Sequence, residues 1–288
     1  MENRLTLLAV LAHPDDESFG MGGTLALYAN QGAAVHLVCA TRGEAGIMDE
    51  EHLKGFTESS EVRESELRCA AKKLGLEGVH FLDYRDSGME GTPENKHPQA
   101  LVMAPIDDVA SKVVYYIRKL KPQVVVTFDP IGGYHHPDHI AIHQATLRAF
   151  TAAGDPSWRP TIPLPEDLPP YKPQKLYYQT ISRTFLKMAV RVMPLLGKDP
   201  SKWGQNGDID LTSLSKIEFP THAVVNFKPV AERKRDASLC HSSQGGSAMV
   251  NGFMRWVVGL GGYKETYMRA FPPPENGKIE KDLFAGVN

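Results

Sequence analysis

The sequence lacks the features that mark several classes of protein. Among its 288 residues, 32 Lys and Arg nearly balance 34 Asp and Glu, so the formal net charge is only −2. Because no basic excess is present, we expect neither nucleic acid nor a membrane as a partner. No apolar run approaches the roughly 20 residues that a membrane-spanning helix needs. The start, MENRLTLLAVLAHPDD, soon reaches charged residues, so we expect no signal peptide.

Cysteine is also scarce. Cys39, Cys69 and Cys240 are too few and too scattered for a disulfide framework or a thiolate metal site. Their odd number is typical of a reducing compartment, and we therefore predict a cytoplasmic protein. Small molecules are the expected partners. The sequence leaves open whether copies of the chain form a homo-oligomer.

The first half of the chain alternates regularly between buried strands and helices. Apolar runs typical of strands buried on both faces occur at residues 5–11, 34–40, 79–82 and 124–128. Helical patterns lie at residues 22–31, 57–76, 105–120 and 137–153. The alternation predicts an α/β fold: a Rossmann-like three-layer sandwich with a mostly parallel sheet and helices on both faces.

The second half has a different character. Residues 155–173, DPSWRPTIPLPEDLPPYKP, are dense in proline and predict an extended connection. Strands near 176–180 and 223–227 and helices near 183–193 and 231–240 are expected beyond it. We predict a Rossmann-like metal-binding catalytic core at residues 1–154. Residues 155–288 are expected to complete the same domain and to cover the site.

Polar, reactive residues follow each strand of the first half. They are the segments 13–16, 41–44 and 84–86, and Asp129, which leads into GGYHHPDH. In parallel sheets, ligands bind beyond the carboxyl ends of the strands. The sequence therefore predicts a binding site at that edge.

Two clusters of His, Pro and Asp at this edge indicate a metal site. Two imidazoles and one carboxylate with an open position are a common ligand set of catalytic zinc. We predict that His13, Asp16 and His139 bind Zn²⁺. Taken alone, Asp16 is equally well explained as a helix N-cap, and a single His in such a loop is usually not a ligand.

Three further residues have predicted catalytic roles. Asp15 stands beside the ligands and can act as general base toward the attacking water. A protonated His136 would stabilise the oxyanion and give a proton to the leaving nitrogen. Asp138 is placed to hold the His136 ring in one tautomer. The glycines of GMGG at 20–23 do not match a dinucleotide fingerprint and predict close packing of the first helix on the sheet.

The motifs AHPDDESFGMGGT and HPDH together resemble the LmbE-like, or PIG-L, family of zinc-dependent de-N-acetylases. Further family landmarks are TRGEAG at 41–46, Arg63 with Glu66, YRDSGM at 84–89, and the segment Lys234 to Gln244. The resemblance thins between about 155 and 220. It implies the same zinc ligands, the base Asp15, and His136 supported by Asp138.

The resemblance also implies roles that the residue pattern alone does not give. Tyr134 falls where relatives of the mycothiol type keep a tyrosine that polarises the amide carbonyl. Arg63 and Asp86 fall where the family holds its substrate, and we include Glu44 and His241 in this substrate-binding set. Gln244 is a further candidate for closing over the site. From the residues alone, Arg63 is better explained as a helix-surface ion pair with Glu66.

One departure from the family pattern concerns Ile47. Mycothiol-type enzymes carry an acidic residue at this place, so the departure puts a thiol-sugar substrate in doubt. The chain also lacks the membrane anchor of the eukaryotic lipid-sugar enzyme, which disfavours a lipid substrate.

We therefore predict a zinc-dependent amidohydrolase that removes an acetyl group from an N-acetylglucosamine-type sugar or conjugate. One alternative is an amidase acting on a thiol conjugate or an N-acyl natural product. Another is a non-catalytic sugar-binding α/β protein, although binding alone does not require a base beside the ligand set.

Overall fold

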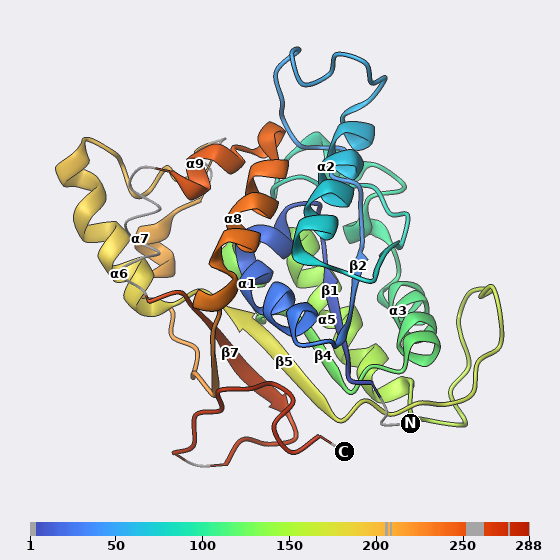
Figure 1. The fold of residues 1–288 in the computed structure, drawn as a ribbon. Helices are drawn as coiled ribbons and strands as arrows, with labels where there is room; N and C mark the ends of the chain where they lie inside the picture. Colours follow the sequence, from blue (N-terminus) through green and yellow to red (C-terminus); the bar gives the residue numbers. More distant parts are fainter. Residues whose placement is uncertain (1–3, 205–206, 208, 252–261, 276, 288) are drawn as a thin grey trace.

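A seven-stranded sheet forms the centre of the molecule (Figure 1). The computed structural model describes residues 4–204, 207, 209–251, 262–275 and 277–287. Its strands are β1 (Thr6–Leu11), β2 (Ala34–Cys39), β3 (Gly78–Phe81), β4 (Val124–Phe128), β5 (Lys175–Thr180), β6 (Ala223–Asn226) and β7 (Lys264–Phe271). They lie in the order β3-β2-β1-β4-β5-β7-β6. The first five pair in parallel, and β7 is antiparallel to both β5 and β6.

Helices cover both faces of this sheet. The helices of the described residues are α1 (Asp16–Asn30), α2 (Ser59–Leu74), α3 (Ile106–Leu120), α4 (Gly132–His135), α5 (Pro137–Ala152), α6 (Arg183–Val192), α7 (Leu211–Leu214), α8 (Ala231–Cys240) and α9 (Gly246–Val250). The connections through α1 and α2 step one way along the sheet, and those through α3 and α5 step the other way. Right-handed crossovers therefore place the two helix pairs on opposite faces. The predicted α/β fold with a mostly parallel sheet is confirmed.

The strands that carry the predicted site lie in the middle of the core. All six residues of β1 and all five of β4 are buried, as their continuous apolar runs predict. The amphipathic α2 ends at Gly75, which takes a left-handed conformation with φ +83°. At Gly23 of α1, a Cβ atom would lie 2.2 Å from the Phe227 ring. This confirms close helix packing as a role of that glycine-rich stretch.

Two elements differ from the sequence-based prediction. Helix α1 begins at Asp16, six residues before the predicted start, so the first polar motif runs into a helix. Strand β7 was not predicted, because its buried positions include Glu265 and Arg269 as well as Tyr267. Charged side chains on the buried face conceal the alternation of apolar and polar residues that marks a strand.

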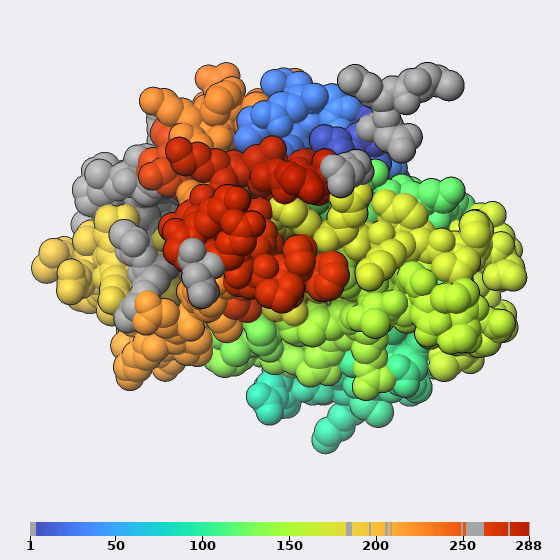
Figure 2. Space-filling view, turned by 90° about the horizontal axis from the view of Figure 1, so that it is seen from below, coloured from blue at the N-terminus to red at the C-terminus, as the bar shows by residue number. Residues whose placement is uncertain are grey.

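The second half extends the same sheet. β5 pairs with β4, and β7 and β6 continue the sheet beyond it. Figure 2 shows the C-terminal residues in red in the middle of one face, between the start of the chain in blue and the proline-rich segment in yellow-green. Tyr28 of α1 donates a hydrogen bond to Asp282 and accepts one from the Leu283 amide. No helix among the described residues is long and apolar enough to cross a membrane.

The structure joins two of the three cysteines. Cys69 of α2 and Cys240 of α8 form a disulfide between residues 171 positions apart in the chain. One bridge is not a disulfide framework, but the expectation of a reducing compartment did not foresee it; the pair meets because the fold packs α2 against α8. Cys39 is free and buried, as expected of a packed apolar residue. The cytoplasmic location stays a prediction, and the cysteines no longer favour it.

Candidate metal centre and active site

The two polar motifs meet where the strand order of the sheet reverses. β1 and β4 are neighbours, but the chain continues from them to opposite sides of the sheet. The segment after β1 carries His13 to Asp16, and the segment after β4 carries His136 to His139. Such a reversal leaves a crevice beyond the carboxyl ends of the strands, which is where ligands bind in open α/β sheets.

The three predicted metal ligands come together at this point. Nδ1 of His13 lies 3.2 Å from Nε2 of His139. The Asp16 carboxylate lies 3.7 Å from the first of these nitrogens and 3.3 Å from the second. Asp16 does not cap α1 through its side chain; its Oδ2 accepts the backbone N–H of His13 at 2.7 Å. The N-cap explanation of Asp16 is therefore wrong.

The hydrogen bonds on the far side of each ring fit a bound cation. Nε2 of His13 lies 3.1 Å from the Asp138 carboxylate, and Nδ1 of His139 lies 3.1 Å from the Gly132 carbonyl oxygen. Both contacts require an N–H on the far nitrogen, which leaves a lone pair on each nitrogen that faces the other ring. Two lone pairs and a carboxylate at these distances repel one another unless a positive charge lies among them.

The pKa values of these groups also indicate a positive charge among the three side chains. Burial lowers the pKa of His139 well below its usual value, so this imidazole is neutral. Burial also acts to lower the pKa of His13, but Asp86, Asp138 and Asp16 outweigh it and raise the pKa well above 6.5. Burial raises the pKa of Asp16 to about 7. Surplus negative charge around His13 therefore favours a cation, either a proton on that ring or a metal ion.

Two other groups among the described residues are close enough to hold a metal ion: His13 with His136 and His139, and His13 with Asp86 and Asp138. Nδ1 of His136 accepts the Asp138 backbone N–H at 3.2 Å, so the proton of the neutral ring is on Nε2. An imidazole held in this way donates a hydrogen bond and offers no lone pair to a metal. The carboxylates of Asp86 and Asp138 already accept the backbone N–H groups of Gly88 and Ser87.

The structure corrects two expectations about His136. The Asp138 carboxylate contacts His13, and the backbone amide of Asp138 fixes the tautomer of His136 instead. This follows because His136 is the N-cap of α5, where a side chain accepts the N–H two residues further on. Burial lowers the pKa of His136 to about 3, so this ring is neutral here and not protonated as predicted.

Asp15 lies beside the ligands in an unusual backbone conformation. Its φ is +124°, in a region that costs a residue other than glycine about 1–3 kcal/mol and that clusters at functional sites. Its Oδ2 lies 3.1 Å from the Arg63 guanidinium. Burial raises the pKa of Asp15, and Arg63 offsets part of that rise. The carboxylate is thus held close to the metal ligands and remains able to take a proton.

Tyr134 lies beside the rings of His139 and His136. Its ring centroid is 5.1 Å from that of His139 and 5.9 Å from that of His136. The preceding Gly132 and Gly133 have φ values of +65° and +70°, and a Cβ on Gly132 would lie 2.8 Å from the Cβ of His139. Glycine is therefore required for the loop that brings Tyr134 to the site.

Three of the predicted substrate-binding residues line the edge of this site. Arg63 is buried and donates to the carbonyl oxygens of Gly43 and Pro14, so the alternative of a surface ion pair with Glu66 is wrong. Asp86 lies 3.4 Å from His13 Nε2 and 3.8 Å from Arg63. The Glu44 carboxylate accepts the backbone N–H of Asp86 at 2.9 Å.

The fourth predicted substrate-binding residue, His241, lies behind the site. It is fully buried, and its Nε2 lies 2.7 Å from the carboxylate of Glu17. Sequence reasoning missed Glu17, although it directly follows the first motif, because an acidic residue in a first helical turn usually faces solvent. Gln244 donates to Ser243 next to it. Ile47, the departure from the family pattern, is exposed.

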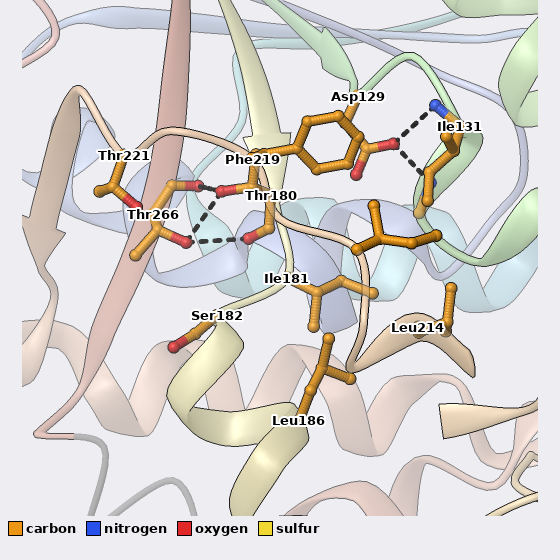
Figure 3. A pocket seen from close by; sticks show the side chains of 12 residues that line it. Asp129, Ile131, Thr180, Ile181, Ser182, Leu186, Leu214, Phe219, Thr221 and Thr266 are labelled. Atoms are coloured by element: carbon orange, nitrogen blue, oxygen red, sulfur yellow. Dashed lines mark hydrogen bonds between the residues drawn. The ribbon is translucent and has the colours of Figure 1, made fainter. Parts of the chain in front are cut away.

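A cavity of about 190 Å³ lies on the far side of the loop that carries Tyr134. Figure 3 shows the Asp129 carboxylate at one end and the paired Thr180 and Thr266 at the other, with Leu186 and Leu214 along the wall. Asp129 accepts the backbone N–H groups of Ile131 and Gly133 and so fixes this loop. The cavity and the metal centre therefore share one wall.

Comparison with known proteins places this site in a family. The chain is 35% identical over 295 residues to the 1D-myo-inositol 2-acetamido-2-deoxy-alpha-D-glucopyranoside deacetylase of Geodermatophilus obscurus, covering 98% of this chain and 97% of the relative. The family model PIG-L, GlcNAc-PI de-N-acetylase, matches residues 8–150. The chain belongs to the PIG-L family. The resemblance expected from the two motifs is thereby confirmed.

Solved structures share the PIG-L fold. N,N'-diacetylchitobiose deacetylase from Pyrococcus horikoshii matches with a TM-score of 0.64 and 20% identity, covering 93% of this chain and 84% of that protein. GalB, the 4-carboxy-2-hydroxymuconate hydratase of Pseudomonas putida KT2440, matches with a TM-score of 0.60 and 20% identity, covering 95% and 99%. A hydratase and a deacetylase on one fold mean that the reaction must be argued from the site.

Proposed function

We propose that this PIG-L chain is a zinc-dependent amidohydrolase that removes the acetyl group from an N-acetylglucosamine-type sugar or conjugate. The observation that carries the proposal is the position of Asp15: a partly buried carboxylate lies beside a convergent His-His-Asp set that it need not join. A protein that only binds a sugar has no need of such a base. The name of the Geodermatophilus relative, a deacetylase of an acetamido-glucopyranoside, supports this substrate class.

We propose His13, Asp16 and His139 as the ligands that hold Zn²⁺. Nitrogen and carboxylate donors in this number suit zinc and leave a coordination position open. When bound, the ion lowers the pKa of water to roughly 7 and polarises the amide carbonyl. Asp138 and the Gly132 carbonyl fix the tautomers of the two imidazoles, so both ligand lone pairs face inward.

The remaining catalytic residues have two tasks: one transfers protons, and the others stabilise the negative charge of the oxyanion. Asp15 takes a proton from the attacking water and can pass it to the departing amine nitrogen. The Nε2–H of His136 donates a hydrogen bond to the oxyanion that forms at the amide carbonyl. We propose that the Tyr134 hydroxyl donates to the same oxygen. The oxyanion thus forms between groups carried by the loop after β4, while the base comes from the loop after β1.

The predicted binding residues have two kinds of role in this proposal. Asp86 lies beside His13 and Arg63 beside Asp15, and we propose that both contact the sugar. Glu44 acts through its hydrogen bond to the Asp86 amide. We also propose that residues 1–154 are the catalytic core and that 155–288 complete the same domain, because β5 from the second half extends the sheet next to β4.

A screen for amine release tests the proposal. The purified, zinc-loaded protein is given N-acetylglucosamine, its glycosides, N-acetylated thiol conjugates and N-acyl natural products, and free amine is measured. We expect acetamido sugars to give the highest kcat/KM. Turnover confined to thiol conjugates would favour the first alternative. Full zinc occupancy with no turnover of any N-acyl compound would leave only a binding protein and would overturn the proposal.

A further inference from the structure

A strained residue at the centre of the site is held by Glu17, which in turn contacts His241 from the second half of the chain. Asp15 keeps a φ of +124°, which a side chain other than glycine adopts only when its surroundings enforce it. Its carboxylate contacts Arg63, but that contact fixes only the side chain. Its backbone N–H is fixed separately, by the carboxylate Oε2 of Glu17 at 3.0 Å.

Glu17 is fully buried and both of its oxygens accept hydrogen bonds. Oε2 accepts from Asp15, and Oε1 accepts from the Ser18 hydroxyl at 2.5 Å and lies 2.7 Å from Nε2 of His241. A carboxylate with this many partners cannot rotate without losing several of them. The position of the Asp15 amide is therefore set by a residue that points away from the metal ligands.

Residues before and after His241 in the chain are fixed to helix α2. The preceding Cys240 is bonded to Cys69 of α2, and the following Ser243 donates its backbone N–H and hydroxyl to Glu66 of the same helix. The ring is fully buried, and its edge packs against Phe19. Helix α2 thus fixes the turn after α8, and that turn fixes Glu17.

We infer that Glu17 is a positioning residue, which together with His241 holds Asp15 in its strained conformation and so aims the base carboxylate at the attacking water. The inference rests on the proposed function for the role of Asp15. It assigns the turn after α8 a part in the reaction although His241 does not line the site. Misplacing a reacting group by about 1 Å is enough to cost on the order of 10²-fold in rate.

The test compares two buried glutamates that make the same kind of contact. Glu17→Met removes both acceptor oxygens while keeping the length of the side chain. The matched control is Glu265→Met, because Glu265 is also buried and accepts two backbone N–H groups of α1, from Gly23 and Thr24, far along the helix from Asp15. We expect Glu17→Met to lower kcat about 100-fold, with KM within about threefold and one metal ion per chain.

The control and a conservative variant separate positioning from general stability. Glu265→Met is expected to lower the thermal midpoint but to leave kcat per folded molecule within about threefold. Glu17→Gln restores one oxygen for the Asp15 N–H and is expected to raise kcat about tenfold above that of Glu17→Met. The inference is overturned if Glu17→Met keeps wild-type kcat, or if Glu265→Met lowers kcat as much. If either Met variant does not fold, Glu17→Gln and Glu265→Gln are compared, with about a tenfold loss of kcat expected only for the first.

Crystal structures give a readout that does not depend on turnover. We expect a positive φ at Asp15 in the wild type and a negative φ in Glu17→Met. A positive φ in both overturns the inference even if the enzyme is a deacetylase. A wild type that releases no amine from any N-acyl compound overturns the proposed function, whereas the change of φ at Asp15 still decides whether Glu17 sets that conformation.

Discussion

The metal centre and a second buried polar group, the Glu280 cluster, differ in how their donors and acceptors balance. The Glu280 cluster consists of Lys175, Tyr177, Arg269 and Glu280. Its one carboxylate accepts from Lys175 at 2.8 Å, from Arg269 at 2.9 Å and from Tyr177 at 2.5 Å. Each charged group there pairs with another across the cluster, although the Nε of Arg269 is buried without a hydrogen-bond partner among the described residues.

At the metal centre, acceptors outnumber donors. Two ring nitrogens with lone pairs and the Asp16 carboxylate face one another, and Oδ1 of Asp138 is buried with no hydrogen bond to any described residue. Buried polar groups are normally satisfied. Charged groups that pair with one another, as around Glu280, belong to the fold alone, whereas surplus acceptors indicate a ligand that carries positive charge.

Removing a predicted metal ligand should have the largest effect on zinc binding and activity. We expect His13→Ala to lose both bound zinc and turnover, with kcat reduced at least about 10³-fold. In the wild type, added zinc should raise the melting temperature because a ligand that binds only the folded state stabilises it. Metal analysis and a zinc titration followed by thermal melting check this. Retention of one tightly bound zinc by His13→Ala would contradict the ligand assignment.

His136→Ala should separate catalysis from metal binding. Because this ring donates from Nε2 and does not face the ion with a lone pair, we expect zinc to remain at one per chain. Loss of one oxyanion donor typically costs about 10²–10³-fold in kcat. The two quantities are measured on the same preparation. Equal zinc loss in His136→Ala and His13→Ala would show that His136 is a ligand, as one of the alternative groups allows.

Glu280→Gln should damage the balanced cluster and leave the reaction intact. It leaves the buried cations of Lys175 and Arg269 without their carboxylate, which costs on the order of 3–5 kcal/mol of unfolding free energy. Activity per folded molecule should not change. Urea unfolding and an activity assay at low temperature measure the two effects, and a stable but inactive variant would contradict the assignment.

The pH dependence of the unfolding free energy gives a further test of the Glu280→Gln prediction. Burial acts to raise the pKa of Glu280, but Lys175, Tyr177 and Arg269 outweigh it and lower the pKa below 4.5. A carboxyl whose pKa is lower in the folded state stabilises the protein fully above its unfolded pKa and loses that contribution as the pH falls through the folded value. The stability difference between wild type and Glu280→Gln should therefore be largest above about pH 4.5 and shrink below it.

The disulfide is expected to have the smallest of these effects. Replacing both Cys69 and Cys240 by Ser should lower the unfolding free energy by about 2–4 kcal/mol, since the bridge closes a long loop in the unfolded chain. Urea unfolding with and without a thiol reductant measures this. The reductant should destabilise the wild type and leave the double variant unchanged. Equal sensitivity of both proteins would show that the bridge does not form in solution.

The sequence predicted those parts of the fold whose signal is local. The buried strands before His13 and Asp129 could be predicted because each is a continuous apolar run. The meeting of His13, Asp16 and His139 could be predicted because these side chains follow two such strands, and their role as ligands stays a prediction. Strand β7 could not be predicted, since the buried Glu265 and Arg269 pair with Lys234 and Glu280, which only the folded chain brings near. The contacts of Glu17 with His241 and of Cys69 with Cys240 could not be predicted either, because only the folded chain brings these residues together.

The most direct test of the central claim is an anomalous diffraction map at the zinc edge from crystals of the zinc-loaded protein. The account predicts one strong peak, bounded by Nδ1 of His13, Nε2 of His139 and the Asp16 carboxylate, with Asp15 beside it and unbound. A peak bound by His136 in place of Asp16, or no peak among these side chains in a protein with one zinc per chain, would contradict it.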